Sequence, residues 1–495
     1  MQSRNKPWMM PVAKNFNPGL LMPCLFLLFF PILLSAQTTV LWGDSIQVSS
    51  TPLPVTAPRV ALLADGTPMV TWGTSSSSVS QIWCARFENG TFTTPVPVVQ
   101  SPNKPVLFGF GGYDVAVSDS QVYVVFEQLQ DGIWITRSDD GGLTFSTPIQ
   151  VQSAISGGYV TISSVVVDGT GNPVVSYIRE KTGAIYEVRR SPDGGESFGD
   201  PVTANAPAPG GEVCECCSSD LLASGDSVWI VFRNNNQNKR DIWVSRSTDL
   251  AASFTLATDV DNTDWQINTC PISGPRMTRM GDSLLTVWMS QASGMSRVYS
   301  SSLHAGTMAL GQQISFPNLP GPSVAQTVPD IVALEDTVGV VFLEKSKEIV
   351  FYHSVNGMTG LNAQPQRIAL PNHTLQYPSL AFKNGVFHLV YADATADKVL
   401  YRQGALTGNS GMEEPGDEAI SVFPNPVTEG SLWVSSTREA LRRIQVFDVL
   451  GYPVLEERTS GFSVQVHTRG LSQGIFFLRI ETDKGVSIQK IMVKP

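Results

Sequence analysis

Charged side chains are scarce in this chain of 495 residues, since Asp, Glu, Lys and Arg together make up only 15% of it. No amphipathic helical run crosses the middle of the sequence, which argues against a protein built on charged helical surfaces. The 42 glycines and 33 prolines are spread out, as tight turns between short strands require. The hydrophobic content of 42% supports a large core. We therefore expect an all-β protein of two or more units.

The chain also lacks a basic patch. Its 33 Lys and Arg residues stand against 43 Asp and Glu residues, which gives a net charge of −10. Contacts to phosphate groups dominate nucleic-acid affinity, and an acidic protein makes few of them. The sequence therefore predicts that the protein binds no nucleic acid.

Only one stretch is strongly apolar, the run Leu20–Leu34 near the N-terminus. The basic residues before this run are Arg4, Lys6 and Lys14. A basic region, a short apolar run interrupted by Pro23 and Pro31, and small residues at its end are typical of a secretory signal peptide rather than a membrane anchor. We expect cleavage after Ala36, so that residues 1–36 are removed and no transmembrane segment remains.

Cysteine is rare as well, and one of the six cysteines leaves with the signal peptide. The remaining five are Cys84, Cys214, Cys216, Cys217 and Cys270. Export permits disulfides, but an odd number leaves at least one cysteine outside simple internal pairing. There is no Cys-x-x-Cys-His signature for haem attachment.

A turn of the form Ser-x-Asp-x-Gly-x-Thr/Ser-Phe occurs three times after similar strands. Its copies are Ser138, Asp140, Gly142, Thr144 and Phe145; then Ser191, Asp193, Gly195, Ser197 and Phe198; and finally Ser247, Asp249, Ser253 and Phe254, with Ala251 at the glycine position. Three copies in the same order indicate a structural repeat.

The repeat extends over the whole middle of the chain. A buried strand ends on an aromatic residue seven times, at Trp72, Phe126, Tyr177, Phe232, Trp288, Phe342 and Tyr391. Units of about fifty residues with three or four antiparallel strands are typical of β-propeller blades. Residues 37–405 are therefore predicted to form a propeller, with seven blades or, if one unit is irregular, six. The last unit has three strands, so we expect residues 39–48 to supply its fourth and join the two chain ends.

The end of the chain differs from the repeats in composition and strand pattern. Residues 406–419 are polar and acidic, as in a mobile linker, and residues 420–495 alternate like a small Ig-like β-sandwich. The motifs Phe423-Pro424-Asn425-Pro426 and Gly470–Phe476 resemble the C-terminal sorting domain of the type IX secretion system of Bacteroidota. This resemblance implies that residues 420–495 engage the type IX machinery, and that the protein is secreted or held on the outer cell surface.

The repeated turns resemble the Asp box, or bacterial neuraminidase repeat, of the sialidase superfamily. The resemblance implies that these turns lie on the face away from the substrate. Sialidases hold the substrate carboxylate with three arginines and use a tyrosine nucleophile. Arg59, in Ala57-Pro58-Arg59-Val60, partly matches the family's first arginine run, and Tyr377, in Gln376-Tyr377-Pro378, stands where a nucleophilic tyrosine would.

If the turns lie on that face, the segments that enter the inner strands lie on the opposite, top face. The repeat then brings Cys214, Cys216 and Cys217 beside Cys270 there. Three interpretations of this cluster stay open. Cys270 forms a disulfide with one of the other three, or the four sulfurs bind Cu(I) or Zn(II) although Cys-x-Cys-Cys is not the usual zinc spacing, or the cluster has a redox or cofactor-attachment role.

Arg59, Arg233 and Arg276 are expected at the same level as the cysteines. Their guanidinium groups suit a carboxylate or an acidic glycan, although salt bridges at the rim would use the same residues. We therefore expect a binding propeller that presents its top face to a glycan or protein. The alternatives are a sialidase-type glycoside hydrolase that uses these arginines with Tyr377, and an extracellular copper- or zinc-binding protein.

Overall fold

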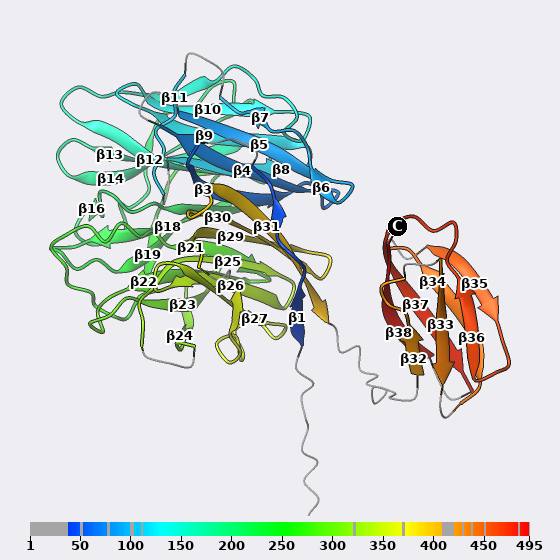
Figure 1. The fold of residues 1–495 in the computed structure, drawn as a ribbon. Helices are drawn as coiled ribbons and strands as arrows, with labels where there is room; N and C mark the ends of the chain where they lie inside the picture. The colour runs from blue at the N-terminus through cyan, green and yellow to red at the C-terminus, as the bar shows by residue number, and fades with distance from the viewer. Residues whose placement is uncertain are drawn as a thin grey trace, which may run out of the picture. The chain divides into compact units, whose positions relative to one another are not determined.

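The computed structural model describes residues 38–49, 53–76, 80–99, 103–109, 112–319, 323–368, 372–407, 420–427, 430–436, 439–449, 452–483 and 486–494. The predicted signal peptide (1–36) and residues 408–419 of the predicted linker lie outside this set. Every regular element in the described ranges is a β-strand (Figure 1). Within these ranges, no helix is long and apolar enough to cross a membrane.

The described residues between 38 and 407 form seven antiparallel sheets, numbered here along the chain. Sheet 1 holds β3 (Val55–Leu62), β4 (Pro68–Ser75), β5 (Ser80–Glu88), β6 (Thr91–Phe92) and β7 (Val96–Pro97). Sheet 2 holds β8 (Tyr113–Ser118), β9 (Gln121–Gln128), β10 (Gly132–Ser138) and β11 (Ile149–Ser153). Sheet 3 holds β12 (Tyr159–Val167), β13 (Pro173–Glu180), β14 (Ala184–Arg190) and β15 (Val202–Thr203).

The remaining four sheets follow the same plan. Sheet 4 holds β16 (Glu212–Val213), β17 (Asp220–Ser224), β18 (Ser227–Asn235), β19 (Ile242–Ser247) and β20 (Leu256–Asp259). Sheet 5 holds β21 (Arg276–Met280), β22 (Ser283–Ser290), β23 (Arg297–His304) and β24 (Leu310–Ser315). Sheet 6 holds β25 (Gln326–Leu334), β26 (Thr337–Glu344), β27 (Glu348–Ser354) and β28 (Gln366–Ile368). Sheet 7 holds β29 (Leu375–Lys383), β30 (Val386–Asp393), β31 (Lys398–Thr407), β1 (Thr39–Trp42) and β2 (Ile46–Gln47).

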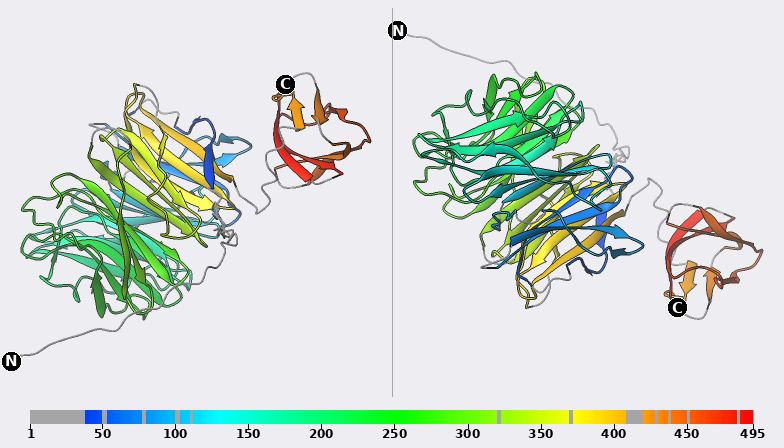
Figure 2. Two further views of the ribbon diagram at one scale, coloured as in Figure 1. Left: turned by 90° about the horizontal axis from the view of Figure 1, so that it is seen from below. Right: turned by 90° about the horizontal axis from the view of Figure 1, so that it is seen from above.

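The sheets close into a ring through the first long strand of each. These inner strands contact one another in the order β3, β8, β12, β17, β21, β25 and β29, and β29 contacts β3 again. Figure 2 shows the sheets from two further directions. Sheets that radiate from a closed ring of inner strands make a β-propeller. The second strand of each sheet is packed on both faces; in β9, for example, only the terminal residues are not buried. This packing explains why these strands read as continuous apolar runs.

The ring is closed by pairing the two ends of this region, as the sequence predicted. β1 lies antiparallel to β31, with Thr39 opposite Thr407, and β2 extends the pairing with Ile46 opposite Tyr401 (Figure 1). The side chain of Gln366 adds a tie to sheet 6, because its Nε2 donates to the Val40 carbonyl at 3.0 Å. The prediction that residues 39–48 complete the last sheet is confirmed.

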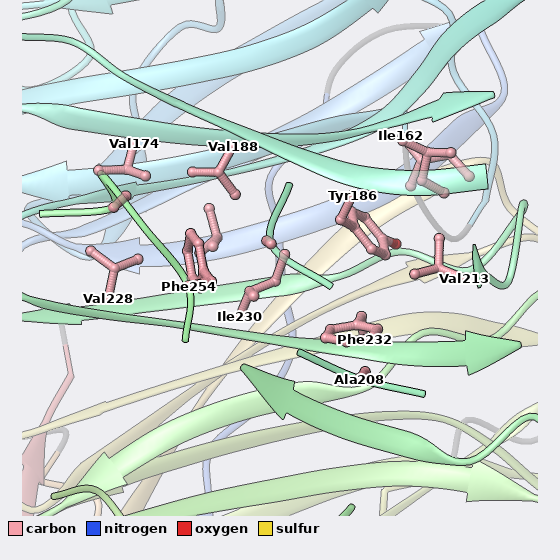
Figure 3. Close-up of a cluster of buried hydrophobic side chains, with 14 of the residues drawn as sticks. Ile162, Val174, Tyr186, Val188, Ala208, Val213, Val228, Ile230, Phe232 and Phe254 are labelled. Carbon is pink, nitrogen blue, oxygen red and sulfur yellow. The ribbon is translucent and has the colours of Figure 1, made fainter. Parts of the chain in front are cut away.

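Aromatic residues fill the spaces between neighbouring sheets. All seven of the predicted aromatic positions are fully buried: Trp72, Phe126, Tyr177, Phe232, Trp288, Phe342 and Tyr391. Figure 3 shows the cluster between sheets 3 and 4, where Tyr186 lies beside Phe232 and Val213. The rings of Tyr186 and Phe232 are 5.8 Å apart. Val213 directly precedes Cys214, so this core fixes the start of the cysteine segment.

The three repeated turns lie at one end of the sheets, called here the lower face. Asp140 of the first turn lines a surface hollow together with Asp65 and Asp119, which belong to the turns after β3 and β8. In each copy the serine hydroxyl donates to the aspartate, and the aspartate accepts the backbone N–H and the hydroxyl of the Thr or Ser four residues later. The turns thus lock hairpins and leave the other end of the sheets, the upper face, for other roles.

Residues 420–494 form two further antiparallel sheets. One holds β32 (Ile420–Phe423), β33 (Ser431–Ser436) and β36 (Ser463–His467), and the other holds β34 (Leu441–Phe447), β35 (Pro453–Arg458), β37 (Gly474–Thr482) and β38 (Val486–Val493). Both sheets contribute to one core, which includes Leu432, Val434 and Val466 from the first and Val446, Leu478 and Ile480 from the second. The alternation of exposed and buried residues along β34 and β37 follows from this two-layer packing.

Candidate functional site

Each inner strand enters the ring at the upper face, and four of them share a β-bulge there. The bulge residue has a backbone in the left-handed region, where side chains other than glycine are rarely found. These residues are Ala57, Ile162, Val328 and Tyr377, with φ between 45° and 53°. Register shifts follow the same four positions. The unusual backbone of Tyr377 is therefore part of the repeat and not a special feature of this tyrosine.

Beyond the bulges, one equivalent position recurs in the inner strand of each sheet. We call these seven the channel ring: Arg59, Asp114, Ser164, Asp220, Arg276, Asp330 and Ser379. Six of them line a central cavity of about 360 Å³. Three carboxylates tie neighbouring sheets together, because Asp114 accepts the N–H of Val165 at 3.2 Å, Asp220 that of Met277 at 2.8 Å, and Asp330 that of Leu380 at 2.8 Å.

The two arginines of the ring cannot take part in these ties, since a guanidinium group has no acceptor. Arg276 lies 3.6 Å from Asp220. Burial lowers the pKa of Arg276, but the charges of Asp220, Asp114 and Asp330 outweigh this effect and raise it. Burial also raises the pKa of Asp220 to about 6, against the pull of Arg276. The charges of Arg276 and Asp220 thus compensate each other.

Arg59 is less well compensated. Burial, and then repulsion from Arg276, lower its pKa and outweigh the attraction of Tyr113, Asp114 and Asp330. Its Nε is buried without a hydrogen-bond partner in the described part of the chain. Its hydrogen bond goes to the neighbouring Pro58 carbonyl, at 3.4 Å. A partly buried cation with so few hydrogen-bond partners is the group in the ring that most favours an added anion.

The upper end of the cavity narrows to a small pocket of about 40 Å³, which Arg59, Arg276, Asp330 and Tyr377 all line. The Tyr377 hydroxyl packs against Gly109, where an added Cβ would lie 1.8 Å from the hydroxyl oxygen. Burial raises the pKa of Tyr377. The structure therefore brings together three of the four residues that the sequence suggested for catalysis or carboxylate binding.

The fourth, Arg233, does not line this pocket. Its side chain is fully buried, and its guanidinium donates to the carbonyls of Ser273 (3.2 Å), Arg240 (2.8 Å) and Met289 (2.7 Å). It also stacks over the Trp265 ring at 5.1 Å. These contacts use Arg233 to hold the backbones of sheets 4 and 5 together, so an arginine triad of Arg59, Arg233 and Arg276 is not assembled.

The four predicted cysteines do converge. Their sulfur atoms all lie within 4.8 Å of one another. The structure pairs Cys216 with Cys270 as a disulfide, with the Cα atoms 6.4 Å apart, and leaves Cys214 and Cys217 as thiols. The sulfur of Cys214 lies 2.9 Å from that of Cys217 and 3.6 Å from that of Cys270. Cys84 is buried in sheet 1, apart from this cluster, and burial raises its pKa to about 12.

Polar groups surround the cluster. Arg240 donates to the Cys214 sulfur at 3.1 Å and to the Glu215 carboxylate at 3.0 Å. The hydrogen bond from Cys217 has the largest effect and lowers the pKa of Cys214. Burial acts to raise this pKa and the charge of Arg240 acts to lower it, and the net result is a lowered pKa. Burial and the neighbouring Cys214 raise the pKa of Cys217. The Tyr186 hydroxyl donates to the Cys217 carbonyl. Ser218 and Ser273, next to the cluster, line the small pocket.

Sequence reasoning overlooked Asp114, Asp220, Asp330 and Arg240. The three aspartates carry no motif, but their spacing from Arg59 and Arg276 follows the repeat of about fifty residues. Aligning the inner strands would have placed them in one ring. Nothing in the sequence around Arg240 marks it as a neighbour of Cys214.

Comparisons with known proteins agree with the two-part organisation. Residues 421–494 match the family described as the secretion system C-terminal sorting domain. This domain links the protein to the type IX secretion system and shows that it is exported to the cell surface or beyond. Among curated proteins, no sequence matches the chain.

Several solved structures resemble the chain at low identity. A protein of unknown function from Dyadobacter fermentans is 11% identical, with 74% of this chain and 99% of that chain covered and a TM-score of 0.43. An α-L-arabinanase of Penicillium chrysogenum is 10% identical, with 74% and 98% covered and a TM-score of 0.42. The intramolecular trans-sialidase of Ruminococcus gnavus is 10% identical, with 74% and 97% covered and a TM-score of 0.40. The fold assignment rests on the closed ring of sheets rather than on these likenesses.

Proposed function

We propose that the protein is an exported, seven-bladed β-propeller that binds a carboxylate-bearing glycan at the upper end of its channel, through Arg59 and Arg276. Each of the seven sheets is taken as one blade, residues 37–405 as the propeller, and residues 420–495 as an Ig-like sorting domain that delivers it. The observation that carries the proposal is the partly buried Arg59 side chain, whose buried Nε has no hydrogen-bond partner among the described residues.

The charges of the pocket favour an anionic group. Arg59 and Arg276 both line it, whereas Asp330 is the single carboxylate among its lining residues. A guanidinium pairs with a carboxylate through two parallel hydrogen bonds, which are stronger than bonds between neutral groups. A carboxylate beside Arg59 would supply the acceptor that the Nε lacks. It would also relieve the repulsion from Arg276 that lowers the pKa of Arg59.

The size of the pocket limits the mode of binding. Its volume of about 40 Å³ suits a carboxylate with a few water molecules. Sites that enclose a ligand of ordinary size have volumes of roughly 300–1,000 Å³. The sugar ring would therefore rest against the loops around the pocket, with only its acidic group inside. This arrangement supports recognition of a glycan end rather than its enclosure for reaction.

A sialidase-type hydrolase is the alternative, and two contacts weigh against it. Arg233 is saturated by three backbone carbonyls and is not free to hold a substrate. In the described part of the chain, the Tyr377 hydroxyl makes no hydrogen bond to a carboxylate that could act as its base. We expect no hydrolysis of a fluorogenic sialoside. Hydrolysis that is lost in Tyr377→Phe would establish the enzyme and overturn the binding proposal.

Calorimetric titration of the full chain with sialyllactose, glucuronate and neutral lactose tests the proposal. We expect the acidic saccharides to bind and lactose not to. Removing one charged hydrogen-bonding partner costs about 1.5–3 kcal/mol, so Arg59→Ala should weaken binding by about 10- to 100-fold. Arg59→Lys keeps the charge but loses the paired hydrogen bonds, and an intermediate affinity is expected.

The matched control is Arg367→Ala, which removes an arginine of β28 that pairs with Glu348 and does not line the pocket. This variant should bind as the wild type does. Equal affinity of Arg59→Ala and wild type would contradict the proposed site. Binding of an acidic peptide but of none of the acidic saccharides would contradict the choice of a glycan and favour a protein ligand.

A further inference from the structure

The four cysteines of the upper face lie closer together than separate disulfides require. A disulfide needs one pair of neighbouring sulfurs, and its geometry places no demand on other cysteines. Here the sulfurs of Cys214, Cys216, Cys217 and Cys270 are all within 4.8 Å of one another. The segments that carry them are separated by more than fifty residues and belong to two different sheets.

This separation matches a tetrahedral metal site. Zinc–sulfur bonds of about 2.3 Å in a tetrahedron place the sulfurs about 3.8 Å from one another. The Cys214 and Cys270 sulfurs are 3.6 Å apart. The Cys214 and Cys217 sulfurs are closer, at 2.9 Å, and would have to move apart to reach this spacing. Small movements of side chains would complete the set with Cys216.

The surroundings would balance the charge of such a site. Four thiolates around Zn(II) carry a net charge of −2. Arg240 donates to the Cys214 sulfur at 3.1 Å, and both Arg240 and Arg233 act electrostatically on Cys214. The side chains of both arginines are buried. Hydrogen bonds to ligand sulfurs and nearby positive charges are the usual second layer of a thiolate site.

Backbone contacts hold the two segments in place without using the sulfurs. The Cys214 N–H donates to the Arg233 carbonyl at 2.9 Å. Gly274 lies so close to Ser218 that an added Cβ would be 2.2 Å from the Ser218 carbonyl oxygen. The two segments are therefore packed backbone to backbone, so the cluster does not depend on a covalent cross-link for its geometry.

We propose that Cys214, Cys216, Cys217 and Cys270 bind one Zn(II) ion as thiolates. The zinc site would join sheets 4 and 5 beside the small pocket of the channel. In this state Cys216 and Cys270 are both reduced thiolates. The disulfide between them is the form with two electrons fewer, so the zinc state belongs to the reduced chain. The proposal is independent of the glycan site, because it rests on different side chains and a different ligand.

Metal binding is measured on the full chain, reduced and freed of metal without oxygen, then titrated with Zn(II) against a coloured chelator. We expect one zinc ion per chain, confirmed by elemental analysis. Cys217→Ser should lose this tight binding, and Arg240→Met should weaken it by about 10-fold, as loss of a second-layer partner does. Cys84→Ser is the matched control, since Cys84 is buried elsewhere and should leave zinc binding unchanged.

Protein purified without chelators gives a second readout that needs no variant. Alkylation followed by mass spectrometry should label Cys214, Cys216, Cys217 and Cys270 only after a chelator is added. Labelling of these residues that requires a reductant instead, with no zinc retained by the reduced chain, would overturn the proposal in favour of disulfides. Copper retained in place of zinc would overturn the assignment to zinc. Substituted Co(II) without the absorption of tetrahedral thiolate coordination would also contradict it.

Discussion

The two faces of the propeller differ in how regularly their polar contacts repeat. On the lower face, three copies of one turn repeat the same hydrogen bonds, and Asp140, Asp193 and Asp249 each accept several of them. On the upper face, Arg59 keeps a buried nitrogen without a partner, and four sulfurs crowd into one place. Side chains that repeat around the ring stabilise the fold, whereas we interpret side chains that interrupt the repeat as ligand-binding groups.

The channel ring shows this division at single positions. Asp114, Asp220, Asp330 and Ser379 use their oxygen atoms to accept the N–H of the next sheet. An arginine at the same place cannot accept, so Arg59 interrupts the pattern. The predictions that follow test whether a satisfied group is structural and an unsatisfied one functional.

The largest effect is expected at Arg233. Arg233→Met would leave three buried carbonyls without donors, and we expect a loss of about 3–5 kcal/mol in the free energy of unfolding. Arg59→Met removes a partly buried charge that has few hydrogen-bond partners, so the stability of this variant should be unchanged or slightly higher. Urea unfolding of the two variants measures the difference. Equal losses would mean that Arg59 is also a structural residue.

Glycine positions in the lower turns should give the next largest effect. Gly142 has φ of +88°, and an added Cβ would lie 2.8 Å from the Met69 sulfur and 2.9 Å from that of Cys84. Gly142→Ala should cost about 2–3 kcal/mol from backbone strain and overpacking. Ala251 holds the equivalent place with φ of +65°, so Ala251→Gly should gain up to about 1 kcal/mol. Thermal unfolding measures both, and opposite signs are required.

A smaller effect is expected from pH, because the stability contributions of Asp220 and Asp140 should depend on pH in opposite directions. Burial raises the pKa of Asp220 to about 6, so its contribution to stability is full below pH 3.8 and is lost as the pH rises through 6. Burial also acts to raise the pKa of Asp140, but hydrogen bonds from Thr144 and Ser138 outweigh it and lower the pKa to about 2. The contribution of Asp140 is therefore full above pH 3.8 and is lost as the pH falls towards 2.

Unfolding free energies of Asp220→Asn and wild type, measured at pH 4 and pH 7, test this contrast. The wild type should lose about 2 kcal/mol more than the variant between the two values, since one pKa unit corresponds to about 1.4 kcal/mol. Asp140→Asn should not gain stability relative to the wild type between pH 4 and pH 7. A variant that parallels the wild type at both pH values would mean that Asp220 is not held in a desolvated position.

Most of the fold could be predicted from the sequence because the chain repeats one structural unit. The aromatic positions from Trp72 to Tyr391 gave the register of the second strands, and the short last unit implied that residues 39–48 would complete it. The register also placed Cys270 beside Cys214, since both enter inner strands at the same level. Such inferences depend only on where the backbone runs.

The direction of individual side chains could not be read in this way. Arg233 stands near the end of β18, at the expected level, yet its guanidinium turns to the carbonyls of neighbouring loops. The aspartates of the channel ring went unnoticed because each is an isolated carboxylate without a motif. Their role comes from the N–H groups of the adjacent sheet, which only the closed ring brings close. The oxidation state of the cysteines depends on metal and redox conditions and not on the backbone.

One pair of measurements tests the division between the faces most directly: the affinity for sialyllactose and the melting temperature of Arg59→Ala and Gly142→Ala. The account predicts that Arg59→Ala binds about 10- to 100-fold more weakly at an unchanged melting temperature. It predicts that Gly142→Ala, at a temperature where it is folded, melts lower but binds as the wild type does. Unchanged affinity in Arg59→Ala, or weakened binding in folded Gly142→Ala, would contradict it.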